Sequence, residues 1–268
     1  MAASAVTKPD NVPVVILCGG EGTRFREETQ FRPKALIDIG EYPILWHVMN
    51  IYLQHGFKRF ILCLGYKGSM IKEYFDKYEM QIRDYTMNMG TGQVKFNDEI
   101  PNMDWQITFA ETGPTTLTGS RIKRVEKYID TENFMVTYAD GMADVDVGEL
   151  YDFHLSHGKI GTVTGARSAS QFGELITEGD KVTNFAEKPK VVSLINGGFF
   201  VFRREFFNYL DNLDDCILER DPMEKLVADS ELQMYRHEGF WQCLDTYKDY
   251  LYLNKLWTTN RAPWIGEL

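Results

Sequence analysis

Apolar strand-like runs alternate with helix-like segments over the first 78 residues, and this alternation constrains the fold more than any other feature of the chain. Residues 12–18 (VPVVILC) and 59–65 (RFILCLG) are continuous apolar runs, as expected for strands that are buried on both faces. Residues 43–54 and 69–78 carry apolar side chains at helical spacing. A strand–helix–strand–helix order implies right-handed crossovers and therefore a parallel sheet.

We predict that the remaining residues complete the same α/β domain. Residues 80–102 are polar, rich in Met and Asn and without a clear period, which indicates an excursion from the sheet. No repeat or linker interrupts the chain, so residues 1–12 are expected to form a flexible tail and residues 13–268 a single domain. Further strands are predicted at 105–109, 133–138, 161–166, 194–202 and near 233–237, a hairpin around Glu178–Asp180, and helices at 119–129, 147–157 and 247–258.

Three helix starts carry capping signals. Ser69 is the candidate N-cap of the second helix, and Asp146 opens a capping-box pattern before the helix at 147–157. Asp245 can cap the last helix, which would leave Asp249 in solvent.

Bulk composition excludes several classes of function. The net charge of −10 argues against a nucleic-acid partner, although a small anionic ligand needs only a local cluster of donors. No apolar run approaches the roughly 20 residues of a membrane helix. The N-terminal residues MAASAVTKPDN lack the basic and apolar parts of a secretory signal.

Cys18 and Cys63 lie inside apolar strand-like runs, which predicts buried free thiols at these two positions. Cys18, Cys63, Cys216 and Cys243 lie far apart in the sequence and form neither a CxxC pair nor a zinc-binding spacing. We therefore expect a reducing, cytoplasmic location.

A glycine-rich turn, GGEGTR at residues 19–24, follows the first strand directly. It lacks the Gly-Lys-Ser/Thr ending of a Walker loop and the third glycine of a dinucleotide fingerprint. Its glycines let backbone N–H groups approach a phosphate, and Arg24 adds a planar positive charge. Lys34, in the RPK run at 32–34, offers a second cation. The alternative interpretation of the turn is a tight strand exit with a surface arginine. The alternative interpretation of Lys34 is a solvated surface side chain.

Acidic residues follow strand-like segments at two points of the chain. A carboxylate at the carboxyl end of a parallel strand, such as Asp140, points into the crevice where open α/β sheets bind ligands, and its oxygens suit Mg²⁺. An ordinary turn aspartate is an equally good interpretation of Asp140. Asp245 would share the metal if the fold brings the two together. For Asp144 and Asp146 we favour a solvated loop and a helix cap.

Two motifs in the second half have the composition of a ligand site. Lys188 lies in FAEKPK just before Pro189, and Glu187 beside it can accept hydrogen bonds from hydroxyl groups. Asn196 and Gly197 interrupt an apolar strand, and glycines in strands often mark a bulge or the close approach of a ligand. A simple kink is the alternative interpretation.

In their order along the chain, these motifs resemble the sugar-phosphate nucleotidyltransferases. The resemblance spans roughly residues 13–264 and is strongest to the glucose-1-phosphate cytidylyltransferase branch. The stretches that carry it are GGEGTRF, RPKALIDIG, EYPILWHVMNIY, LGYKGSMIKEYF, TLTGSRIKRV, YADGMADVD, NFAEKPK, INGGFFVF and FWQCLDTYKDYLYLNKLW.

The resemblance implies a Rossmann-like α/β fold with a mixed, mostly parallel sheet, a nucleotide-binding N-terminal half and a sugar-phosphate-binding C-terminal half. It implies that CTP and α-D-glucose 1-phosphate react, with Mg²⁺, to give CDP-glucose and pyrophosphate. By analogy Arg24, Lys34 and Asp140 would be catalytic, and Asp140 and Asp245 would hold the metal. The nucleotide would contact Gly19, Gly20, Gly22, Thr23, Arg24, Thr118, Gly119 and Arg121, and the sugar phosphate Glu187, Lys188, Asn196 and Gly197.

The chain departs from the family pattern at three places. Ala35 follows Lys34 where the family has PKP, and Ala139 stands in YADG where the family has YGDG. Residues 167–171 lack the Pro-Pro-Gly-Arg-like sequence expected there, and this loop would lie near the sugar.

The proposed chemistry needs no general base. A phosphate monoester has a second pKa near 6, so a sugar-phosphate oxygen is already ionised at pH 7. The difficulty is to bring two polyanions together, and phosphoryl-type transfer is helped mainly by positioning and charge stabilisation. Arg24, Lys34, Lys188 and Mg²⁺ are the components that such a site needs.

Two other functional classes are compatible with the sequence. A glycosyltransferase would use Asp144 and Asp146 as a DxD metal motif and would release a nucleoside diphosphate. A non-catalytic binder on the same fold would bind CTP without turnover. We expect the protein to form a homo-oligomer, and Trp257 and Trp264 would pack in its interface or on their own chain.

Overall fold

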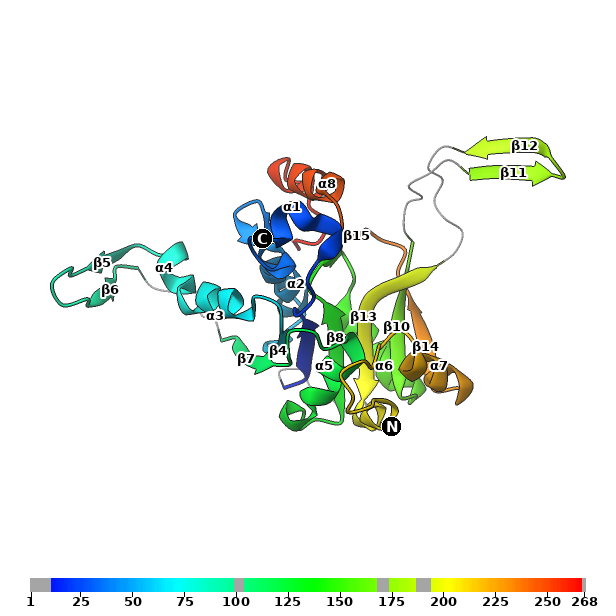
Figure 1. The fold of residues 1–268 in the computed structure, drawn as a ribbon, viewed down its shortest axis with the longest axis horizontal. Helices are drawn as coiled ribbons and strands as arrows, with labels where there is room; N and C mark the ends of the chain where they lie inside the picture. Colours follow the sequence, from blue (N-terminus) through cyan, green and yellow to red (C-terminus); the bar gives the residue numbers. More distant parts are fainter. Residues whose placement is uncertain (1–10, 99–103, 168–173, 187–193, 267–268) are drawn as a thin grey trace, which may run out of the picture.

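A seven-stranded sheet forms the centre of the protein (Figure 1). The computed structural model describes residues 11–98, 104–167, 174–186 and 194–266. In the sheet order β14-β10-β13-β8-β1-β4-β7, only β13 among these strands runs antiparallel to its neighbours. The expected mixed, mostly parallel sheet is confirmed. The strands are β1 Pro13–Leu17, β4 Arg59–Leu64, β7 Gln106–Glu111, β8 Asn133–Tyr138, β10 Gly161–Ala166, β13 Ile195–Arg203 and β14 Leu232–Arg236.

Helices cover both faces of the sheet and create two apolar cores. Along β1, Val14 and Ile16 face one core, whereas Val15 and Leu17 face the other, and all four are buried. This explains why β1 is apolar without alternation. The first core takes α2 Ile44–Leu53, α6 Val147–His157 and α8 Tyr247–Thr258; the second takes α5 Thr118–Arg124 and α7 Asp221–Ala228.

Two hairpins extend away from the body of the molecule (Figure 1). The excursion predicted at 80–102 contains the pair β5 Tyr85–Met87 and β6 Val94–Phe96, which follows α3 Gly68–Asp76 and α4 Tyr78–Ile82. The hairpin predicted around Glu178–Asp180 is the pair β11 Glu174–Glu178 and β12 Lys181–Ala186. Smaller elements are α1 Arg26–Thr29, β2 Asp38–Ile39, β3 Tyr42–Pro43, β9 Gly141–Ala143 and β15 Trp241–Cys243.

Most predicted element bounds are confirmed, and the exceptions have local causes. The helix predicted at 119–129 ends at Arg124 and continues as a 3-10 turn over Glu126–Tyr128. The Ser69 N-cap is wrong, because α3 starts one residue earlier from Lys67 in the left-handed conformation, without a side-chain cap. Asp146 is confirmed as the N-cap of α6, since it accepts a hydrogen bond from the Glu149 backbone N–H at 2.8 Å.

The C-terminal aromatic residues pack on their own chain. Trp264 is 2% exposed, and its indole N–H donates to His47 Nδ1 at 3.3 Å. Trp257 donates to Glu41 Oε2 at 2.7 Å. Within the described ranges, no helix is both long and apolar enough to cross a membrane.

Candidate active site

The pairing of two short strands brings Asp140 and Asp245 together. Asp140 lies between β8 and β9, and Asp245 lies between β15 and α8. Strands β9 and β15 pair with Cys243 opposite Gly141, and the Leu244 N–H donates to the Asp140 carbonyl at 2.9 Å. Two aspartates more than 100 residues apart in the sequence therefore share one site at the carboxyl end of the parallel strands, which is the position that open α/β sheets use for ligands.

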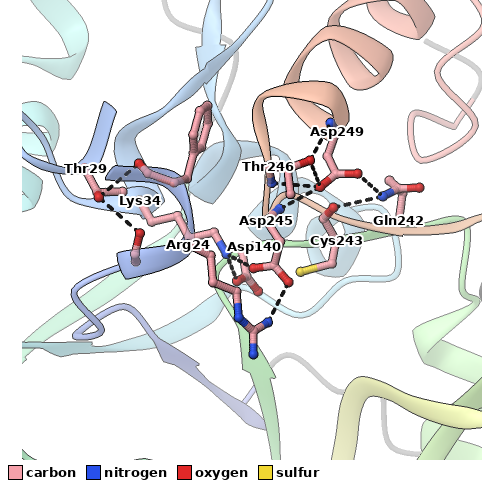
Figure 2. Close-up of polar contacts among 11 residues, drawn as sticks. Arg24, Thr29, Lys34, Asp140, Gln242, Cys243, Asp245, Thr246 and Asp249 are labelled. Atoms are coloured by element: carbon pink, nitrogen blue, oxygen red, sulfur yellow. Dashed lines mark hydrogen bonds and ion pairs between the residues drawn. The ribbon is translucent and has the colours of Figure 1, made fainter. Parts of the chain in front are cut away.

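Lys34 and Arg24 bind these carboxylates (Figure 2). Lys34 Nζ donates to Asp140 Oδ2 at 2.5 Å and to Asp245 Oδ1 at 2.6 Å. Arg24 Nη1 donates to Asp245 Oδ2 at 2.9 Å. Lys34 occupies this place because Pro33, in extended conformation, leads into a 3-10 turn that begins at Lys34. The site thus contains two cations and two carboxylates in mutual contact.

Burial and charge act in opposite directions at this cluster. Burial alone would lower the pKa of Lys34, but the attraction of Asp140, together with hydrogen bonds to both carboxylates, raises the pKa well above its usual value. Burial alone would raise the pKa of Asp245, but Lys34 and Arg24 outweigh it and lower that pKa. Both groups are therefore charged at neutral pH, and the Lys34 side chain is only 14% exposed.

The oxygen atoms of this cluster suit a divalent cation. Asp140, Cys243 and Asp245 each offer a ligand atom, and the three atoms lie within 4.8 Å of one another. Burial raises the pKa of the Cys243 thiol, with Asp140 adding to the effect, so the thiol is protonated and a poor ligand. Two carboxylates beside an open cavity fit Mg²⁺, which usually binds one or two carboxylates and completes its shell with water and substrate phosphates.

The glycine turn after β1 is held by hydrogen bonds from the residues that follow it. Gly22 has a left-handed backbone (φ 62°), and its carbonyl accepts hydrogen bonds from Thr29 Oγ1 at 3.1 Å and from the Phe25 N–H at 3.0 Å. Thr23 and Arg24, in the 3-10 turn that follows, are exposed. The turn is therefore ordered while its outer residues remain accessible to a ligand.

The buried side chain of Arg121 packs against the glycine turn and holds it by a hydrogen bond. It is 4% exposed, and its guanidinium donates to Gly19 O at 3.0 Å, Thr112 Oγ1 at 2.7 Å and Gly113 O at 2.8 Å, with further bonds to Leu64 O and Pro114 O. These acceptors are neutral. The guanidinium is thus a buried positive charge that links the glycine turn to the ends of β4 and β7, and burial lowers its pKa.

A cavity of about 260 Å³ lies between the glycine turn and the start of α5. Asp140 lines this cavity. So do six residues of the N-terminal half that were expected to be catalytic or to bind the nucleotide: Gly19, Gly20, Gly22, Lys34, Thr118 and Arg121. Gly119 does not line this cavity, and its N–H donates to Cys216 O at 3.0 Å. Ala35 and Ala139, the departures from the family pattern, are buried and also line this cavity.

A second cavity, of about 390 Å³, adjoins the cluster on the other side. Arg24, Asp140 and Asp245 line it, as do Asn196 and Gly197, which the family resemblance would place beside the sugar. Asn196 Oδ1 accepts a hydrogen bond from the Gly198 N–H at 2.9 Å, which shapes the backbone at this interruption of β13. Asp140 therefore lies at the junction of the two cavities.

Sequence reasoning missed three side chains of the second cavity. Tyr138 lines both cavities, and its hydroxyl donates to Glu219, which also accepts from Thr118 Oγ1 at 2.8 Å. The Trp241 indole N–H donates to Gly197 O at 2.8 Å. Tyr138 could have been found as the last residue of β8, whereas Glu219 and Trp241 carry no local signal.

Several predicted positions lie outside the described residues. These are Glu187, Lys188 and residues 168–171 of the loop that departs from the family pattern, together with the first ten residues of the expected tail. Their roles stay predictions.

Asp144 and Asp146 serve the fold. Asp144 Oδ1 accepts from the Phe240 N–H at 2.7 Å and lies 3.1 Å from His237 Nε2. Asp146 caps α6 and lies 3.2 Å from His55 Nδ1. Asp144 lies in an exposed loop, as expected, and its carboxylate ties β9 to the turn before β15.

Asp249 is the largest departure from the sequence-based expectation at the site. It was expected in solvent, but it is 9% exposed and accepts four hydrogen bonds (Figure 2). Thr246 caps α8, with Asp249 completing a capping box, so the expectation that Asp245 caps this helix is wrong. The side chain of Asp245 is free of that task and binds Lys34 and Arg24.

The comparison with known families decides the relationship of the chain. The family described as "Nucleotidyl transferase" matches residues 13–260. The chain belongs to this family. A protein of Bacillus subtilis (strain 168), named "Probable glucose-1-phosphate cytidylyltransferase", is 45% identical over 250 residues, which cover 93% of this chain and 98% of the relative. A Salmonella typhi protein named "Glucose-1-phosphate cytidylyltransferase" is 43% identical over 252 residues, covering 93% and 97%.

Solved structures with low sequence identity to this chain share its fold. HddC from Yersinia pseudotuberculosis superposes with a TM-score of 0.68 at 21% identity, over 92% of this chain and 99% of its own. A UDP-glucose pyrophosphorylase complexed with UDP-glucose gives a TM-score of 0.68 at 15% identity, over 93% and 99%. At these identities the likeness concerns the fold alone, and it agrees with the predicted Rossmann-like architecture.

Proposed function

We propose that this nucleotidyl transferase moves a cytidylyl group from CTP to α-D-glucose 1-phosphate, giving CDP-glucose and pyrophosphate. The observation that carries the proposal is the 43–45% identity, over 93% of the chain, to proteins named as glucose-1-phosphate cytidylyltransferases. The site supports it, because a cavity beside a glycine turn and a second cavity beside Asn196 meet at the cluster of Lys34 and two aspartates.

In this proposal the two cavities take the two substrates. The nucleotide binds in the first cavity, between the glycine turn and Thr118, and the sugar phosphate binds in the second, beside Asn196 and Gly197. Asp140 lines both, so the reacting phosphates meet at the cluster. Trp241 supports the sugar side because its indole holds the Gly197 carbonyl. Glu187 and Lys188 remain candidates for the sugar and its phosphate.

The chemistry fits the groups present. The attacking sugar-phosphate oxygen is ionised at pH 7 and needs no base. His47 and His154 are buried, and burial lowers their pKa to about 4 and about 3, so both are neutral structural groups. Arg24 and Lys34 would neutralise the phosphates and hold the nucleophile in line with the α-phosphorus, which is where positioning and charge stabilisation act.

Mg²⁺ belongs to the proposal as a cofactor. Asp140 and Asp245 would hold it, and when bound it would withdraw negative charge from the phosphates. Lys34, which pairs with both carboxylates in the nucleotide-free protein, would then turn to a phosphate oxygen.

Base recognition falls to the segment before α5. The resemblance places Gly119 and Arg121 at the nucleotide. In the structure the Gly119 N–H is engaged by Cys216 O, and the Arg121 guanidinium is engaged by five acceptors around the glycine turn. Arg121 would therefore act on the nucleotide by shaping the turn. Thr116, Leu117 and Thr118 line the cavity and are the groups that we assign to the pyrimidine.

A matrix of nucleotides against sugar 1-phosphates, read by pyrophosphate release, tests the proposal. CTP with α-D-glucose 1-phosphate should give the highest kcat/KM. Equal rates with UTP would remove the cytidylyl assignment, and a better sugar 1-phosphate would replace glucose. CTP binding without turnover of any pair would favour a non-catalytic binder.

The glycosyltransferase alternative loses its metal motif. Asp144 and Asp146 are engaged by Phe240 and by the start of α6, and neither lines the two cavities. Release of a nucleoside diphosphate from CDP-glucose, with no pyrophosphate formed in the forward matrix, would reinstate it.

Self-association and a cytoplasmic location complete the proposal. The β5–β6 hairpin extends from the body and exposes Tyr85, Met87 and Met89, which supports a homo-oligomer (Figure 1). All four cysteines are free thiols, which supports a reducing compartment. Light scattering coupled to size-exclusion chromatography tests the first, and cell fractionation the second.

A further inference from the structure

The Asp249 carboxylate accepts more hydrogen bonds than the cap of α8 requires. Its Oδ2 accepts from the Thr246 N–H at 2.8 Å and from Thr246 Oγ1 at 2.8 Å, which are contacts within the cap of α8. The same oxygen accepts from the Asp245 N–H at 3.1 Å, and Oδ1 accepts from Gln242 Nε2 at 2.9 Å. The last two contacts lie outside the helix and reach the end of β15.

These contacts fix the main chain on both sides of the Asp245 side chain. The Leu244 N–H donates to the Asp140 carbonyl, whereas the Asp245 and Thr246 N–H groups both donate to Asp249. Three consecutive amides are thus held by two aspartates. The Asp245 carboxylate, which projects from this segment, contacts Lys34 and Arg24 at 2.6 and 2.9 Å (Figure 2).

We infer that Asp249 is a positioning residue, which holds Asp245 in place for Lys34 and for the metal of the proposed reaction. Asp249 itself lines neither cavity and contacts no group that we assign to substrate. Its effect passes through the Asp245 backbone. Displacement of a reacting group by about 1 Å can cost on the order of 100-fold in rate, so a loosened segment 244–246 should lower turnover without removing the carboxylate.

The structure provides a matched pair of variants. Thr246→Ala removes the hydroxyl that caps α8 through the Asp249 N–H at 3.3 Å, but it leaves the bonds from the Asp245 and Thr246 amides to Asp249. Asp249→Ala removes the carboxylate and all four of its bonds. Both variants weaken the cap, and only Asp249→Ala frees Asp245.

The inference rests on the proposed function for its kinetic readout, so a structural readout accompanies it. We expect Asp249→Ala to lower kcat roughly 100-fold with a smaller change in KM, and Thr246→Ala to keep kcat within about threefold despite a lower Tm. Asp249→Asn keeps one carbonyl oxygen for the Asp245 and Thr246 amides and should recover most of the turnover. Crystal structures of the nucleotide-free variants should show Asp245 displaced from Lys34 in Asp249→Ala alone.

Each result decides between the alternatives. Wild-type kcat in Asp249→Ala, or equal loss in Thr246→Ala and Asp249→Ala, would overturn the inference, because the second outcome assigns the effect to helix capping. If Asp249→Ala does not fold, the Asp249→Asn variant tests the inference in its place. Loss of turnover in Asp249→Asn while Asp245 still contacts Lys34 would also contradict the inference. If the wild type releases no pyrophosphate from any pair, the proposed function fails, while the crystal structures still test the positioning of Asp245.

Discussion

The Lys34 ammonium lies 2.5 Å from Asp140 Oδ2 and 2.6 Å from Asp245 Oδ1, so one cation joins two carboxylates that lie 106 and 211 residues away in the sequence. These are the oxygens that we assign to Mg²⁺. A lysine and a divalent cation cannot both take the same place between them. The nucleotide-free protein therefore carries its own counter-ion, and a metal ion bound by these carboxylates would compete with it.

Replacement of Lys34 by Met should separate its two tasks. Turnover should fall about 100- to 1,000-fold, as when a preorganised charge is removed from the reacting phosphate. Binding of Mn²⁺ to the nucleotide-free protein, followed by electron paramagnetic resonance, should become tighter because two carboxylates lose their resident cation.

Lys77→Met is the control for this change, because Lys77 is an exposed lysine that pairs with Glu73 on α3. It should alter neither turnover nor Mn²⁺ binding. Unchanged Mn²⁺ affinity in Lys34→Met would show that the lysine does not compete with the metal.

Arg121→Lys should lower both stability and nucleotide affinity. A lysine ammonium has three donors on a flexible stem, whereas the Arg121 guanidinium meets five acceptors in a fixed geometry. Each buried carbonyl left without a donor costs about 1–3 kcal/mol, so the free energy of unfolding in urea should fall by about 2 kcal/mol or more. The Kd for CTP, measured by calorimetry, should rise because Gly19 is no longer held.

A neighbouring arginine of the same helix is the matched control. Arg124 is 39% exposed at its side chain and donates to Thr112 O and to Thr116 Oγ1, but not to Gly19. Arg124→Lys should raise the Kd for CTP less than Arg121→Lys does, because Arg124 holds Thr116 but does not contact Gly19. An equal rise in both variants would mean that the loss comes from α5 in general and not from the support of Gly19.

Gly19→Ala should destabilise the protein more than Gly20→Ala. A Cβ at Gly19 would lie 2.1 Å from Arg121 Nη1, and this guanidinium is buried and cannot move aside. At Gly20 no atom lies within 4 Å of the added carbon. We expect a loss of about 3 kcal/mol for Gly19→Ala and less than about 0.5 kcal/mol for Gly20→Ala in urea unfolding. Equal stability of the two variants would contradict the close packing of Arg121 on the turn.

The elements that could be predicted from the sequence are those with a strong local pattern. Strands such as β1 and β4 are apolar without interruption because the sheet is covered on both faces, and α6 starts where the Asp146 cap indicates. The resemblance placed Asp140 and Asp245 in one site, but nothing local indicated their contact. That contact depends on β9 and β15, which are three-residue strands too short to show a period.

The roles of buried polar residues could not be predicted for a related reason. In the sequence, Asp249 looks like a surface residue of the helical segment YKDYLYLN. Arg121 looks like a basic residue of a helix that faces solvent or ligand. Both are buried because residues outside their own helices, Gln242 for Asp249 and Gly19 for Arg121, bring complementary groups to them. Composition and spacing carry no record of such partners.

Stability should fall as the pH is lowered from about 6.5 to about 4, in part because of His47. In the folded protein His47 Nε2 faces the Ile39 carbonyl at 2.8 Å, and Nδ1 accepts from the Trp264 indole. Burial lowers its pKa from 6.5 to about 4, so between these values the unfolded chain binds a proton that the folded chain does not. The stability present above pH 6.5 is thus lost as the pH falls toward 4, by up to about 3 kcal/mol.

His154 adds to the same effect, because burial, with His157 nearby, lowers its pKa to about 3. Urea unfolding of the wild type and of His47→Asn at pH 7.5, 6 and 5 separates the two histidines. At pH 7.5 both are neutral in both states, so the difference there reports packing alone. At pH 5 the difference should shrink by about 2 kcal/mol, because the variant has lost the proton uptake of His47 on unfolding. A difference that stays constant across the three pH values would mean that His47 is not held neutral by the fold.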